Sequence, residues 1–127
     1  MILNCRETFP VVRTLLFLAA FGGPVFAADT DLVNRVAQLE SNGDLTEARS
    51  LLTQQAASSN DSTTAQMLAE FLCRHADRSC RDATAKWAAG ESDPVKKKLA
   101  LREVTLLDFM QGRDTDLASD LGQYRAA

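Results

Sequence analysis

The chain has 127 residues, with 17 acidic and 14 basic side chains and a formal net charge of −3. This length is enough for one small domain, and a mildly acidic chain lacks the basic surface that nucleic-acid binding requires. We therefore expect a single domain that does not bind nucleic acid.

The N-terminal region has the order of a secretory signal peptide. Two arginines precede an apolar run from Leu15 to Phe26, and small residues then lead to a predicted cleavage after Ala27. The alternative is a retained membrane anchor, but the run is shorter than the roughly 20 residues that a spanning helix needs and is interrupted by two glycines and a proline. We predict a signal peptide at 1–27, an exported domain at 28–127, a periplasmic or secreted location, and no stable membrane insertion.

Apolar residues recur at helical spacing through the rest of the chain, and no strand pattern is present. Leu32, Val36 and Leu39 are separated by four and three residues, which places them on one helix face. The predicted helices cover Asp31 to Asn42 with Thr30 as N-cap, Leu45 to about Ala57, Thr63 to Arg74, a fourth helix that carries Ala83 and Trp87, Pro94 to about Met110, and Thr115 to about Tyr124.

Turn and cap residues mark the ends of these helices. Gly43 and Gly112 are placed to end a helix, because glycine adopts the left-handed conformation without a side-chain penalty. Asp44 and Asp93 are predicted N-caps, and Pro94 fits the first helical position, where its missing N–H costs nothing. The six helices thus form three hairpins.

The three hairpins repeat at a fixed spacing. Ala48, Ala83 and Ala118 are 35 residues apart, and so are three bulky residues on the first helix of each pair. Small residues at one place let helices approach closely, while bulky ones fill the space between them. This period predicts an all-α fold, an α-solenoid of three helix-turn-helix hairpins, with a generic helical bundle as the alternative. The predicted packing residues are Val36, Ala48, Leu52, Phe71, Ala83, Trp87, Leu106 and Ala118.

The stretch NGDLTEARSLL, residues 42–52, resembles the turn and second helix of a tetratricopeptide repeat (TPR). Weaker copies lie at residues 78–87 and 113–122. The resemblance implies a scaffold whose first helices line a groove for a protein or peptide partner.

The stretch FLCRHADRSC, residues 71–80, holds two cysteines and the only histidine of the chain. On one continuous helix, Cys73 and Cys80 would lie about 10.5 Å apart, too far for a disulfide, but a turn between them would bring them together. Because an exported protein meets an oxidising compartment, we expect a Cys73–Cys80 disulfide. The alternatives are free buried thiols and a metal site made of Cys73, His75 and Cys80, which is one ligand short of a structural zinc site. His75 is otherwise a helix-end cation or an exposed turn residue.

Catalytic motifs are absent from the sequence. Asp114 and Asp116 lie where carboxylates complement a helix dipole, and Trp87 and Tyr124 are expected in the core rather than at a ligand. We therefore expect a protein that is not an enzyme and uses no cofactor.

The sequence predicts an exported helical-repeat scaffold that binds a protein or peptide in the cell envelope. Its last helix has apolar residues that no further helix would cover, which predicts pairing of the C-terminal helix with a partner or with a second copy of the chain. The alternative function is a small metal carrier that uses Cys73, His75 and Cys80.

Overall fold

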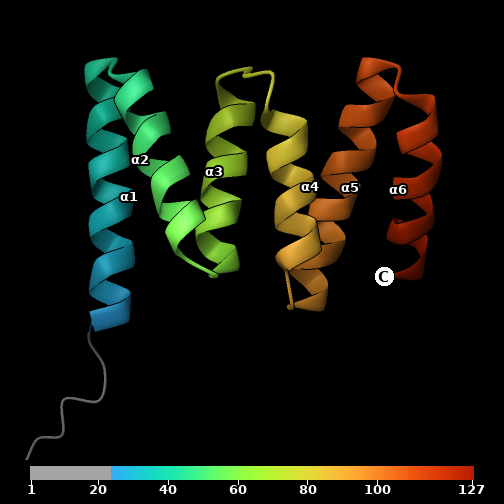
Figure 1. The fold of residues 1–127 in the computed structure, drawn as a ribbon, viewed down its shortest axis with the longest axis horizontal. Helices are drawn as coiled ribbons and strands as arrows, with labels where there is room; N and C mark the ends of the chain where they lie inside the picture. The colour runs from blue at the N-terminus through green and yellow to red at the C-terminus, as the bar shows by residue number, and fades with distance from the viewer. Residues whose placement is uncertain (1–23) are drawn as a thin grey trace, which may run out of the picture.

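A computed structural model of the chain describes residues 24–127, which form helices joined by short turns and contain no strand. The helices are α1 (Pro24–Asn42), α2 (Leu45–Ser58), α3 (Ser62–Arg74), α4 (Cys80–Gly90), α5 (Pro94–Gln111) and α6 (Asp114–Ala126). They follow one another in chain order along the long axis of the molecule (Figure 1). The predicted all-α class is confirmed, whereas most of the predicted signal peptide lies outside the described residues.

The start of the first helix differs from the prediction. Helix α1 begins at Pro24, not behind a Thr30 N-cap, and the predicted cleavage after Ala27 falls in its first turn. Proline is favourable at the start of a helix, and the five residues after Pro24 contain no glycine or proline that would end it.

The predicted caps also differ in outcome. Asp93 accepts hydrogen bonds from the backbone N–H groups of Val95 and Lys96, as expected for an N-cap. Asp44 occupies the N-cap position of α2, as predicted, but its side chain makes no cap hydrogen bond. An unpredicted cap is Asp61, which accepts from the N–H of Thr63 before α3.

Among the described helices, each packs against the helices that precede and follow it in the chain. The buried residues form two clusters. The first contains Val36, Ala48, Leu52, Phe71, Leu72 and Cys80, and the second contains Ala69, Trp87, Ala88, Ala100 and Leu101. Ala83 packs against both clusters and so connects them.

The predicted packing residues divide by position in the chain. Val36, Ala48, Leu52, Phe71 and Trp87 are buried, and Ala83 is half-buried. Leu106 and Ala118 are exposed, contrary to the expectation that they pack between helices. Leu106 lies on the solvent side of α5, and α6, which carries Ala118, has no buried residue.

The three turns inside the hairpins share one backbone motif. In each, a residue just past the end of the helix adopts a positive φ: 82° at Gly43, 52° at Ala76 and 66° at Gly112. The next N–H then donates to a carbonyl five residues back, as in Asp44 to Leu39 at 2.9 Å. The other two such bonds run from Asp77 to Leu72 and from Arg113 to Asp108. These are Schellman motifs, and only the central one lacks glycine at its left-handed position.

We expect the Ala76→Gly variant to be more stable than the wild-type chain by about 0.5 to 1 kcal/mol. The left-handed conformation strains a residue with a Cβ, and this relief exceeds the extra chain entropy of glycine. The matched control is Ala37→Gly in the interior of α1, which should lower stability by about 1 kcal/mol. Urea unfolding measures both; a loss of stability in Ala76→Gly would contradict this account of the turn.

Candidate functional site: a groove between α3 and α5

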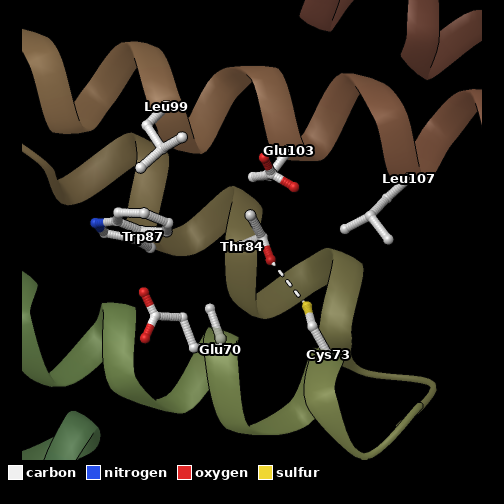
Figure 2. A pocket seen from close by; sticks show the side chains of 8 residues that line it. Glu70, Cys73, Thr84, Trp87, Leu99, Glu103 and Leu107 are labelled. Atoms are coloured by element: carbon white, nitrogen blue, oxygen red, sulfur yellow. Dashed lines mark hydrogen bonds between the residues drawn. The ribbon is translucent and has the colours of Figure 1, made fainter.

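An open groove of about 300 Å³ lies between α3 and α5, with α4 as its floor. Figure 2 shows side chains from all three helices facing this space. The lining residues are Ala69, Glu70 and Cys73 of α3, Thr84 and Trp87 of α4, and Leu99, Glu103 and Leu107 of α5. Most of these contribute apolar surface, and the only two charged lining residues are both acidic.

Helical spacing explains why these residues share the groove. Leu99, Glu103 and Leu107 are four residues apart, so they lie one above another on the same face of α5. The same rule places Ala69 beside Cys73 on α3. The sequence contained this signal: a glutamate midway between two leucines at a spacing of four marks a charge on a largely apolar face.

Trp87 forms part of the floor and is held in place by Glu91. Its indole Nε1 donates to Glu91 Oε2 at 3.1 Å, and the other oxygen of Glu91 accepts from the N–H of Asp93 at 2.9 Å. The hydrogen bond from the Asp93 N–H lowers the pKa of Glu91, with a smaller contribution from Trp87, against the opposing effect of burial. The tryptophan is 3% exposed, as expected for a core residue, and it is one of the residues that line the groove.

The two groove carboxylates stand on opposite walls, Glu70 on α3 and Glu103 on α5 (Figure 2). Glu70 accepts a hydrogen bond of 2.8 Å from Gln66 Nε2, one turn earlier on α3. No basic residue is among the eight that line the groove. The groove therefore presents negative charge beside apolar surface.

The Cys73–Cys80 disulfide predicted from the sequence is present and joins the end of α3 to the start of α4. The turn shortens the distance between the two Cα atoms to 4.7 Å. Cys73 lines the groove and its Sγ lies 3.6 Å from Thr84 Oγ1, whose hydroxyl donates to the Cys80 carbonyl. In this bonded form neither sulfur is a free thiolate, and residues 24–127 contain no group of three or more candidate metal ligands.

His75 ends α3 and connects it to α1 rather than to the cysteines. Its Nε2 lies 2.6 Å from Glu40 Oε1, which also accepts from Arg74 Nη2 at 2.8 Å. The hydrogen bond with His75 lowers the pKa of Glu40, and Arg74 adds to this effect against the opposing effect of burial. The imidazole ring also packs against the Phe71 ring in a tilted arrangement, with the ring centroids 4.7 Å apart. His75 therefore acts as a helix-end residue that joins two helices.

A cluster of charges joins α4, α5 and α6 and was not foreseen from the sequence. Arg81 Nε donates to Asp108 Oδ1 at 2.8 Å, and its Nη2 donates to the other Asp108 oxygen at 3.2 Å and to Asp120 Oδ2 at 2.7 Å. The Asp108 side chain is 0% exposed. Its position between Leu107 and Phe109 was the available sequence signal, because a charge inside an apolar run is either solvated or paired.

The pKa values of the two carboxylates in this cluster are shifted in opposite directions. Burial raises the pKa of Asp108, but the hydrogen bonds and charge of Arg81 outweigh burial and leave that pKa below its usual value. Burial raises the pKa of Asp120, and the neighbouring Asp108 carboxylate raises it further. One arginine thus pairs with two carboxylates. Asp108 receives two of its hydrogen bonds and Asp120 receives one.

The solvent side of α5 carries an apolar stripe. Val95, Phe109 and Met110 are 77%, 71% and 78% exposed, and Leu99 and Leu106 are 43% and 44% exposed. Leu99 belongs both to this stripe and to the groove, so the two form one continuous surface.

Within residues 24–127, no helix combines the length and the apolar character needed to cross a membrane. Comparison of the chain with protein-family models, with characterised proteins and with solved structures gave no match in any of the three.

Proposed function

We propose that the protein is an exported scaffold that binds a segment of a partner protein in the cell envelope. In this proposal, three hairpins stack as a TPR-like α-solenoid. Three observations support that arrangement: consecutive packing of the helices, the repeated Schellman turns and the buried Ala48 and half-buried Ala83 on second helices. Export and the envelope location come from the predicted signal peptide at 1–27.

The groove between α3 and α5 is the observation that carries the binding function. It is open, lined mainly by apolar surface and continuous with the exposed stripe of α5. Contiguous exposed apolar surface with a polar rim is typical of a protein-binding site. Self-association through α6 remains a prediction; α6 has no buried residue in the described chain.

Photo-crosslinking in the source cells tests this function. A photoreactive amino acid at position 99 should give a discrete adduct with one partner, because Leu99 lies where groove and stripe meet. The control is the same amino acid at position 33, since Val33 is 49% exposed but belongs to α1, outside the groove.

An adduct that forms at position 99 and not at position 33 would support the proposal. Equal labelling at both positions, or none at position 99, would contradict it. The mass of the recovered chain tests export independently, because we expect it to begin at Ala28.

A further inference from the structure

We infer that the partner segment is an amphipathic helix that places lysine or arginine side chains against Glu70 and Glu103, beside its apolar anchors. This inference rests on the proposed function and specifies the chemistry of the partner. Its basis is the coincidence of two acids, an apolar floor and a helix-length apolar stripe on one surface.

The charge of the groove favours a cation. Glu70 and Glu103 face the same space from opposite walls, and no lining residue is basic (Figure 2). Arg102, the neighbour of Glu103 in the chain, does not line the groove but lies on the stripe between Leu99 and Leu106, so the partner's cation must point toward the groove and away from Arg102. A partner that brought another carboxylate here would meet like charge, whereas a cation would form hydrogen-bonded ion pairs.

The shape of the surface favours a helix. Val95, Leu99, Leu106 and Met110 follow one another at spacings of four, seven and four, which makes a stripe about 22 Å long along one side of α5. An amphipathic helix of about 15 residues has this length, and its apolar side chains recur every three or four residues along one face. The lysine stem covers apolar surface while its ammonium reaches the carboxylates.

The test uses three fluorescein-labelled 15-residue helical peptides with leucines at positions 2, 6, 9 and 13. They differ only at two positions beside the central leucines, which are both lysine, both glutamine or both glutamate. Binding to the full chain is measured by fluorescence anisotropy. The chain's single tryptophan, Trp87, reports whether the peptide occupies the groove.

We expect the lysine peptide to bind about tenfold more tightly than the glutamine peptide, and the glutamate peptide to bind most weakly. The difference between lysine and glutamine should disappear in Glu70→Gln/Glu103→Gln and persist in the control Glu47→Gln, which removes an exposed carboxylate of α2. It should also shrink as salt is raised, because the groove remains open to solvent.

Three other outcomes would overturn the inference. Equal binding of all three peptides, lost in Leu99→Asp, would refute the charge preference and leave the proposed groove function intact. If no peptide binds, the inference fails, and crosslinking at position 99 decides the proposed function separately. If the chain is a dimer in sedimentation equilibrium that Leu106→Asp converts to monomer, a second copy occupies the stripe and the inferred helix does not.

Discussion

Replacing Arg81 with alanine is expected to lower the free energy of unfolding by about 3 to 5 kcal/mol, a large part of the total for a small domain. Arg81 is the main partner of Asp108, a carboxylate that is 0% exposed. Without the guanidinium, the remaining arginine near Asp108 is Arg113, whose Nε lies 4.0 Å away. A buried charge without compensation is far more costly than a lost surface pair.

The expected loss also has a structural consequence. Arg81 binds Asp120 at 2.7 Å, and α6 has no fully buried residue of its own. The attachment of α6 therefore depends on this ion pair and on half-buried contacts such as Tyr124, whose ring lies 5.5 Å from Lys98 Nζ. We expect α6 to lose protection from hydrogen exchange before the other helices in Arg81→Ala.

Urea unfolding with matched variants separates the buried charge from the loss of a long side chain. Arg102→Ala removes an exposed arginine from α5 and should change stability by less than about 0.5 kcal/mol. In an Asp108→Asn background, Arg81→Ala should cost only about 1 kcal/mol, because the neutral amide needs no counter-charge. Equal effects of Arg81→Ala and Arg102→Ala would show that the cluster contributes no stability.

Local signals predicted the helices and turns well because they depend on residues close in the chain. Gly43 and Gly112 end helices by their own conformational freedom, and Asp93 with Pro94 begins one through backbone chemistry. The first helix was mispredicted for the same kind of reason. Thr30 is a good N-cap in isolation, but here it lies inside a helix that already begins at Pro24.

The candidate site was harder to predict because it depends on residues that only the fold brings together. Glu70 and Glu103 are 33 positions apart in the chain, and nothing near either one indicates that they line the same groove. Arg81 likewise reads as an ordinary charge in a helix start until Asp108 and Asp120 are placed around it. The periodicity of apolar residues identifies which face of a helix is buried, but it does not identify the helix that packs against that face.

Removing the disulfide is expected to lower the free energy of unfolding by about 2.5 kcal/mol, the value expected for the short loop that it closes. The bond lies across the one hairpin turn whose left-handed residue, Ala76, is not glycine. The backbone conformation is therefore least favourable for its residue at the turn that the disulfide spans. The disulfide compensates for the strain of this turn.

Cys73 is exposed, so a reductant should reach the bond without prior unfolding. Intact mass with alkylation before and after reduction confirms the oxidised state, since only the reduced form should be alkylated at Cys73 and Cys80. Urea unfolding with and without reductant then measures the loss of stability. The Cys73→Ala/Cys80→Ala variant is the control, because reductant should leave its midpoint unchanged. An unchanged midpoint in the reduced wild-type chain would contradict the stabilising role of the disulfide. Because Cys73 also lines the groove, reduction should weaken peptide binding as well as stability.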